Sequence, residues 1–269
     1  MTRRIEAGLE ILSHRPAGRA APTPLLFVHG AFAGAWCWDA YFLPWFAERG
    51  YAAHAVSLRG HGGSYGQDTI HGWSIQDYTD DVVTVLQGME RPPVLIGHSM
   101  GGFVVQHCLA ESEAAGAVLM ASVPPSGLAG PSLSLAVWNP SAAFNIGSVQ
   151  AMGGDWGSPS VMQDALFSTH INRQTAFEFL AKMGPESTRA MMDMFGGNMP
   201  EIDMRMPVPI QVLGAADDEL IPSAFVRATA RRVGVEPHVL DDMGHLMMLD
   251  TGWTRAAESL LDWLHRNGL

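Results

Sequence analysis

An apolar run that breaks at a glycine-flanked serine, and then resumes with helical character, constrains this chain more than any other stretch. The run extends from Val94 to Val105 and reads VLIGHSMGGFVV. Gly97 and Gly101 stand two residues either side of Ser99, where a larger side chain would collide with the tight backbone and with the packing of helix on strand. The stretch therefore predicts a strand, a sharp turn and a helix, with Ser99 at the tip of the turn.

A serine at such a tip is well placed for nucleophilic chemistry. Its oxygen lies near the first backbone N–H groups of the following helix, which stabilise the negative charge that develops when an acyl carbon is attacked. This is the physical logic of the G-x-S-x-G nucleophile elbow. Glycines and serines also form ordinary turns, so the alternative hypothesis is a simple connection without chemistry.

Strands and helices alternate along most of the chain. Short apolar runs predict strands at 25–28, 51–58, 94–98, 117–121, 208–214 and 237–240, with a weaker alternating strand at 4–13. Helical spacing predicts helices at 36–49, 74–88, 223–233 and 253–266, the second capped by Ser74 with Asp77 three residues on. This order predicts an α/β fold with a mainly parallel central sheet and helices on both faces.

The alternation stops between Pro124 and about Met206, where prolines, glycines and short helical patterns replace it. We expect one domain, with residues 1–123 and 207–269 as its core and 124–206 as an inserted helical lid. Nine of the 16 methionines lie between Met152 and Met206. They fill a small helical layer or line an adaptable apolar pocket over Ser99. Five aromatic side chains are candidates for the pocket wall, namely Trp138, Phe144, Trp156, Phe167 and Phe179.

Composition narrows the classes of partner. The net charge of −11 disfavours binding to nucleic acid or to an anionic membrane surface. Cys37 and Cys108 have no metal-ligand spacing and are expected to be small core side chains. No apolar run approaches the length of a membrane span. We therefore expect a cytoplasmic protein with no metal and no organic cofactor, acting on a small molecule, with its oligomeric state left open.

Ser99 needs a base to take its proton and an acid to orient that base. In an open α/β sheet such groups belong on loops at the carboxyl ends of strands. His245 follows the strand at 237–240 on such a loop, whereas His238, His98 and His107 are better explained as packed or surface histidines. The acid is Asp217 or Asp218, on the loop after 208–214, and we prefer Asp218. The chain order Ser, Asp, His matches one of the known triad orders.

An oxyanion hole needs a second backbone N–H from another loop. The loop His29-Gly30-Ala31-Phe32 follows the strand at 25–28, and Gly30 allows a close approach. Ala31 is the expected donor beside Met100, the residue after the nucleophile. His29 is expected to brace this loop.

Together these motifs make the chain resemble enzymes of the α/β-hydrolase fold along essentially its whole length. It is similar in particular to the esterase and hydroxynitrile-lyase-like branch, through residues 29–31, 34–36, 57–62 and 97–101. The resemblance also favours Asp218, because the stretch Asp218 to Pro222 looks like the family's Asp-x-x-(Val/Ile)-Pro. Ser57 departs from the family, where many relatives carry Asp, and this puts a loop-bracing interaction in doubt. Arg59 and His61 are interpreted as structural.

The resemblance implies a carboxylic-ester hydrolase that forms an acyl-enzyme on Ser99. Haloalkane dehalogenases and epoxide hydrolases would need aspartate at that position. Hydroxynitrile lyases need a positive charge near the pocket, and Lys182 is the only lysine. Lactonases, perhydrolases and carbon–carbon bond hydrolases use the same triad and stay open as alternatives. So does a weakly catalytic receptor that binds a small apolar ligand.

Overall fold

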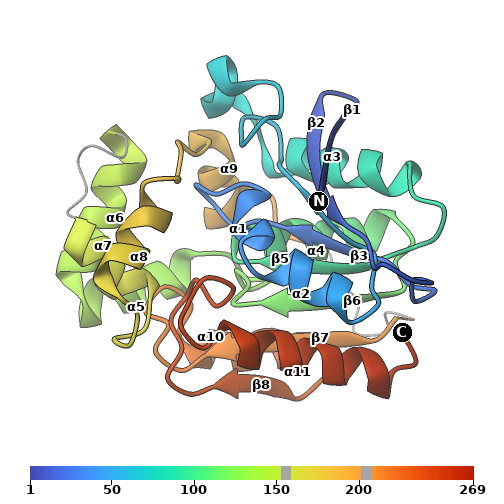
Figure 1. The fold of residues 1–269 in the computed structure, drawn as a ribbon. Coiled ribbons are helices and arrows are strands. Elements are labelled where there is room, and N and C mark those ends of the chain that lie inside the picture. The colour runs from blue at the N-terminus through green and yellow to red at the C-terminus, as the bar shows by residue number, and fades with distance from the viewer. Residues whose placement is uncertain (153–158, 201–207) are drawn as a thin grey trace.

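A computed structural model describes residues 1–152, 159–200 and 208–269. Its described part contains an eight-stranded sheet in the order β1-β2-β4-β3-β5-β6-β7-β8 (Figure 1). The strands are β1 (Thr2–Glu6), β2 (Leu9–His14), β3 (Leu25–Val28), β4 (Ala53–Val56), β5 (Val94–His98), β6 (Gly116–Met120), β7 (Ile210–Ala215) and β8 (Pro237–Leu240). Along this order, each strand from β4 to β8 pairs parallel with the next one. The predicted mainly parallel sheet is confirmed.

The single strand expected at 4–13 is wrong. The segment forms two antiparallel strands, with Arg4 opposite Ile11, and β2 then pairs antiparallel with β4. Ala7 and Gly8 form the connection with positive φ angles of 50° and 83°. The weak alternation concealed this tight turn, because side chains on both sides of it continue the same two-residue period.

The central strands are buried on both faces, as parallel strands covered by helices must be. Every residue of β3, β4, β5 and β6 is buried. One face packs against α1 (Trp36–Asp39), α2 (Phe42–Glu48) and α11 (Trp253–Arg266). The other face packs against α3 (Ile75–Gln87), α4 (Met100–Glu111) and α10 (Ser223–Val233). Both cysteines, Cys37 and Cys108, are buried and free within these layers, as expected.

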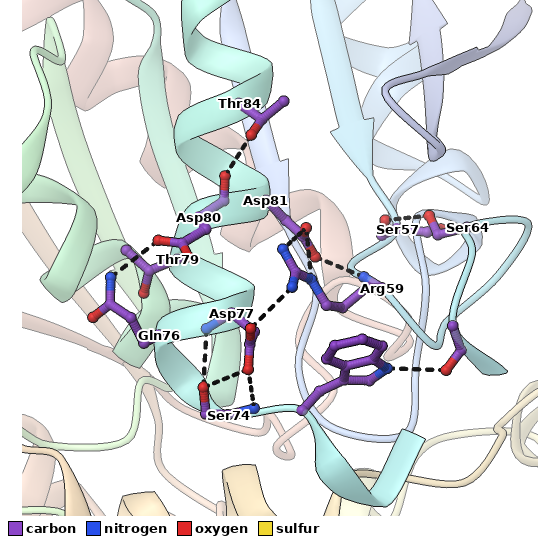
Figure 2. Close-up of polar contacts among 12 residues, drawn as sticks. Ser57, Arg59, Ser64, Ser74, Gln76, Asp77, Thr79, Asp80, Asp81 and Thr84 are labelled. Carbon is purple, nitrogen blue, oxygen red and sulfur yellow. Dashed lines mark hydrogen bonds and ion pairs between the residues drawn. The ribbon is translucent and has the colours of Figure 1, made fainter. Parts of the chain in front are cut away.

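The helix expected at 36–49 divides into α1 and α2, because Tyr41 leaves the helical conformation at φ −141°. Its ring stacks on Trp253 of α11 with centroids 4.9 Å apart, so a tertiary contact interrupts the local pattern. The predicted cap of α3 is present. Ser74 Oγ accepts the Asp77 N–H at 3.1 Å, and the Asp77 carboxylate accepts the Ser74 N–H at 2.8 Å (Figure 2).

Between β6 and β7 the described residues form helices and connecting loops. We call residues 124–152 and 159–200 the helical insert. It contains α5 (Ala129–Trp138), α6 (Pro140–Met152), α7 (Pro159–Leu166), α8 (Arg173–Leu180), α9 (Thr188–Met192) and a π-helical turn at Asp193–Gly197. Figure 1 shows α5, α6, α7 and α8 gathered at one side of the sheet.

Candidate active site

Ser99 lies between β5 and α4 with a strained backbone, at φ 52° and ψ −117°. The flanking glycines are required by close backbone contacts. A Cβ at Gly97 would lie 2.3 Å from the carbonyl oxygen of Gly101, and a Cβ at Gly101 would lie 2.3 Å from that of His29. The local sequence therefore forces the turn that the GHSMG motif predicts, and Ser99 lines a large cavity.

The structure brings His245 together with Asp218 and not with Asp217. The His245 Nδ1 atom lies 2.8 Å from Asp218 Oδ2, and both side chains are buried. The other carboxylate oxygen of Asp218 accepts the N–H groups of Leu220 and Ile221 at 2.9 and 2.8 Å. Asp217 is exposed. His245 also lines the cavity that Ser99 lines.

Two residues that sequence reasoning missed support the His245 loop. His98 Nε2 donates to the carbonyl oxygen of His245 at 2.9 Å, and the two rings lie 4.7 Å apart. Complete burial, together with the neighbouring His245, lowers the pKa of His98 well below its usual value, so it is a neutral donor. Asp250, fully buried, accepts the Gly244 N–H at 2.9 Å and the Ser168 N–H of the insert at 2.7 Å.

The remaining rival histidines have structural surroundings. His238 lies in β8 and its Nδ1 bonds Ser259 Oγ at 2.6 Å. His107 packs edge-on against Phe103, and burial lowers its pKa. Neither lines the cavity that Ser99 and His245 share.

The expected oxyanion donors, Ala31 and Met100, both line the same cavity. Met100 is the first residue of α4, so its N–H has no carbonyl one turn earlier to bond. His29 braces the loop that carries Ala31, because its Nε2 accepts the Leu58 N–H at 3.0 Å and its Nδ1 donates to the Gly30 carbonyl. Burial, and then the charge of the nearby His61, lower the pKa of His29 to about 3.

Ser57 braces the same loop from the position where the resemblance led us to expect aspartate. Its hydroxyl accepts the Ala35 N–H at 2.9 Å and donates to Glu10 Oε2 at 2.8 Å. Glu10 belongs to β2, so a carboxylate from another strand bonds the Ser57 hydroxyl. The doubt that the sequence raised about this contact is thereby resolved.

Arg59 is structural, as interpreted from the sequence. Figure 2 shows its guanidinium between Asp81 and Asp77 of α3. The guanidinium lies 2.7 Å from Asp81 Oδ1 and 3.0 Å from Asp77 Oδ1. Asp81 also accepts the Arg59 backbone N–H at 2.8 Å, which ties the loop after β4 to α3.

Glu186 of the helical insert is a further residue that the sequence did not single out. Its side chain is 1% exposed and accepts four hydrogen bonds, two of them from the Phe32 N–H and from His61 Nε2, each at 3.1 Å. An acidic residue in a methionine-rich helical segment has the signature of a surface position. Only the fold shows that it faces inward.

The cavity has a volume of about 820 Å³, within the usual range of small-molecule sites. Among the side chains of the insert that the structure describes, four methionines line it: Met162, Met183, Met191 and Met194. Among its lining residues, all in the described part of the chain, there is no Asp, Glu, Lys or Arg. The polar side chains among these described lining residues are those of His98, Ser99, Ser132 and His245. Lys182 instead lies over the rings of Trp36 and Phe179.

The four predicted wall residues that the structure describes, Trp138, Phe144, Phe167 and Phe179, are not among the residues that line the cavity. Trp138 and Phe144 are 84% and 75% exposed and face solvent. Phe167 and Phe179 are buried against each other, in the layer where the insert packs on the core. Trp156 falls outside the described residues. Helical spacing could not distinguish these outer and inner faces. Among the described residues, the aromatic side chains that line the cavity are Phe32, Phe177 and Phe195.

Comparison with known proteins relates this geometry to a family. Residues 25–258 match the sequence profile described as the alpha/beta hydrolase family. A pyrethroid hydrolase from Sphingobium wenxiniae is 36% identical over 81 residues, which are 30% of this chain and 28% of that protein. Epoxide hydrolase A from Mycobacterium tuberculosis is 33% identical over 111 residues, 40% of this chain and 34% of that protein. The matches span about a third of these two relatives.

Solved structures resemble the chain over nearly its full length. An esterase from Exiguobacterium antarcticum has a TM-score of 0.73 at 18% identity, covering 96% of this chain and 95% of that one. The N-acyl homoserine lactonase AidH, complexed with N-butanoyl homoserine, has a TM-score of 0.73 at 19% identity, covering 99% and 96%. At these identities the likeness concerns the fold. Across the described ranges, no helix combines the length and apolar character needed to cross a bilayer.

Proposed function

Because the chain belongs to the alpha/beta hydrolase family, we propose that it is a serine hydrolase that cleaves a carboxylic ester through an acyl-enzyme. The observation that carries the proposal is the 2.8 Å contact of His245 with Asp218, on the cavity that Ser99 also lines. In this assignment Ser99 is the nucleophile, His245 the base, and Asp218 the group that orients His245.

The proposed reaction has two symmetric halves. His245 takes the proton of Ser99 as Oγ bonds to the ester carbonyl carbon, and the N–H groups of Ala31 and Met100 stabilise the resulting oxyanion. The carbon–oxygen bond to the alcohol then breaks, and His245 gives its proton to that alcohol. Water repeats the attack on the acyl-enzyme, which releases the carboxylic acid and restores Ser99.

The cavity supports an uncharged, apolar substrate of small to medium size. A charged group placed among its described lining residues would lose its hydration without an ionic partner, which costs several kcal/mol. In this proposal residues 124–206, which include the helical insert, are the lid over Ser99, and the four described methionines that line the cavity adapt its wall to different acyl chains. A lactone, being a cyclic ester, is the second candidate, since a lactonase is among the structural neighbours.

A serine at position 99 favours this chemistry over that of epoxide hydrolase A, one of the matched relatives. A fluorophosphonate probe tests the assignment directly, because it phosphonylates only an activated serine. We expect rapid labelling of Ser99 that is lost in both Ser99→Ala and His245→Ala, together with turnover of p-nitrophenyl esters. An inert serine in a protein that binds apolar ligands tightly would instead establish the receptor alternative.

A panel of substrates then separates the acyl-transfer alternatives. Linear esters of two to ten acyl carbons, simple lactones and a peroxide-dependent perhydrolysis assay should be compared by kcat/KM. The proposal expects the highest values for neutral esters. Ser99→Ala should lower kcat by several orders of magnitude with an unchanged circular dichroism spectrum.

A further inference from the structure

Glu186 is a buried carboxylate that the proposed reaction does not use. It belongs to the helical insert, directly before α9, and its two oxygens accept four hydrogen bonds. Oε1 accepts from the Tyr78 hydroxyl at 2.7 Å and from the Ser187 N–H at 2.6 Å. Oε2 accepts from the Phe32 N–H and from His61 Nε2, each at 3.1 Å. Every donor faces the carboxylate, so its environment is built for a negative charge.

The Phe32 contact reaches the loop that carries the proposed oxyanion donor. Phe32 follows Ala31 directly and has a left-handed backbone, at φ 65°, which side chains other than glycine adopt at a cost. Both of its peptide groups bond to the insert, because its N–H donates to Glu186 and its carbonyl accepts the Gly184 N–H at 2.9 Å. The insert therefore holds the strained residue from both sides.

His61 supplies the positive charge that makes a buried carboxylate tolerable. Its Nδ1 lies 3.0 Å from the Arg59 carbonyl and its Nε2 lies 3.1 Å from Glu186. Both partners are acceptors, so both ring nitrogens carry protons and the imidazole is cationic. Burial opposes that charge, but Glu186 and two backbone carbonyls outweigh burial and raise the pKa of His61. Burial likewise opposes ionisation of Glu186, and His61 with the other donors lowers its pKa.

We propose that Glu186 is a positioning residue of the oxyanion hole, acting through Phe32 on the direction of the Ala31 N–H. The proposal rests on ester hydrolysis at Ser99. An oxyanion donor stabilises the transition state only when its N–H group points at the developing oxyanion. Displacing such a group by about 1 Å costs on the order of 100-fold in rate. Binding of the neutral ester does not require this orientation of the Ala31 N–H group. Loss of Glu186 should therefore lower kcat and leave KM nearly unchanged.

The test compares Glu186→Gln with Asp193→Asn in the 269-residue chain. Asp193 is the matched control, since it is another insert carboxylate that accepts a core N–H, that of Ile75 at 3.0 Å, and it does not line the cavity. Whichever way the amide introduced by Glu186→Gln turns, its NH₂ group faces two donors. We expect a 10- to 100-fold lower kcat for Glu186→Gln with KM within about twofold, and both constants within about twofold for Asp193→Asn.

A transition-state analogue distinguishes a misdirected oxyanion donor from a general disturbance of the fold. The affinity for a trifluoromethyl ketone, which adds to serine as an oxyanion, should weaken in Glu186→Gln by the same factor as kcat. Gly184→Pro is a second variant, because it removes the N–H donated to Phe32 and leaves every buried charge in place. It should lower kcat and raise the exchange of amide hydrogens in residues 29–35, even if Glu186→Gln folds poorly.

The outcomes are distinct for the two proposals. A folded Glu186→Gln protein with wild-type kcat, or an equal loss in Asp193→Asn, would overturn the positioning role. A wild-type protein that neither reacts with fluorophosphonate nor hydrolyses esters would overturn the proposed function instead. Amide exchange then still decides the structural half, since faster exchange at 29–35 in Glu186→Gln alone supports the role and unchanged exchange refutes it.

Discussion

His245 Nδ1 lies 2.8 Å from Asp218, whereas Asp217, one residue earlier, is exposed to solvent. The difference arises because Asp218 follows the end of β7 in a turn whose next N–H groups bond its second oxygen. Two adjacent carboxylates of equal charge therefore differ completely in their access to the imidazole.

Asp218→Asn should reduce kcat by about three to four orders of magnitude, because the amide no longer stabilises the imidazolium and allows the wrong tautomer. Asp217→Asn is the matched control and should keep kcat within about twofold of the wild-type value. Steady-state hydrolysis of one p-nitrophenyl ester by the two variants measures this. If Asp217→Asn instead lowered kcat more than Asp218→Asn did, Asp217 and not Asp218 would be the acid of the triad.

A terminal carboxylate on the acyl chain should prevent efficient hydrolysis. We expect kcat/KM for the p-nitrophenyl monoester of adipic acid to be at least about 100-fold below that for p-nitrophenyl hexanoate, since the described cavity lining offers no cation. The methyl-capped adipate ester has the same reach without the charge and should restore turnover. Equal values for charged and capped esters would contradict a neutral cavity.

Gly101→Ala should destabilise the fold by about 1–3 kcal/mol or more, because its Cβ would meet the carbonyl oxygens of His29 and Val28 at 2.3 and 2.4 Å. Backbone atoms of a central strand cannot move aside at small cost. Gly147→Ala in α6 is the control, with open space at its Cβ, and should stabilise by roughly 0.5–1 kcal/mol. Urea unfolding of both variants provides the comparison.

His54 should contribute to acid destabilisation. Burial, and then the charges of Arg4 and Arg15, lower its pKa to about 4, whereas an unfolded histidine titrates near 6.5. As pH falls from about 6.5 to 4, the unfolded state binds a proton that the folded state does not, so the free energy of unfolding decreases. Within this window the free energy of unfolding decreases by about 1.4 kcal/mol for each pH unit.

The His54→Gln variant should therefore show a flatter dependence of unfolding free energy on pH across that window. Urea titrations at half-unit intervals measure the slope, and the exposed His265→Gln serves as the control. Parallel slopes for wild type and His54→Gln would show that His54 takes no extra proton on unfolding.

The fold was largely predictable because its signals are local. The GHSMG turn is dictated by glycines whose Cβ atoms would strike backbone, and the cap of α3 is a contact between residues three apart. Continuous apolar runs correctly predicted the strands that are buried on both faces. The failures came where a tight turn or a distant ring intervened, as at Ala7–Gly8 and at Tyr41.

The supports of the candidate site were not predictable for the opposite reason. Glu186 and Phe32 are 154 residues apart, and His98 bonds His245 across 147 residues. Nothing in the sequence around Glu186 or around His98 indicates that its side chain bonds to a distant loop. The proposed roles of Ser99, Asp218 and His245 came from motif and chain order, which do not reveal what holds their loops.

The hydrogen bonds between insert and core matter for redesign by recombination. Leu166 and Ser168 reach the His245 loop, and Gly184 and Glu186 reach the Ala31 loop. A chimaera that exchanged the whole segment between β6 and β7 would remove these attachments along with the substrate-facing wall. Exchange limited to α5 and α6, which leaves all four attachment residues native, should transfer substrate preference while retaining a working catalyst.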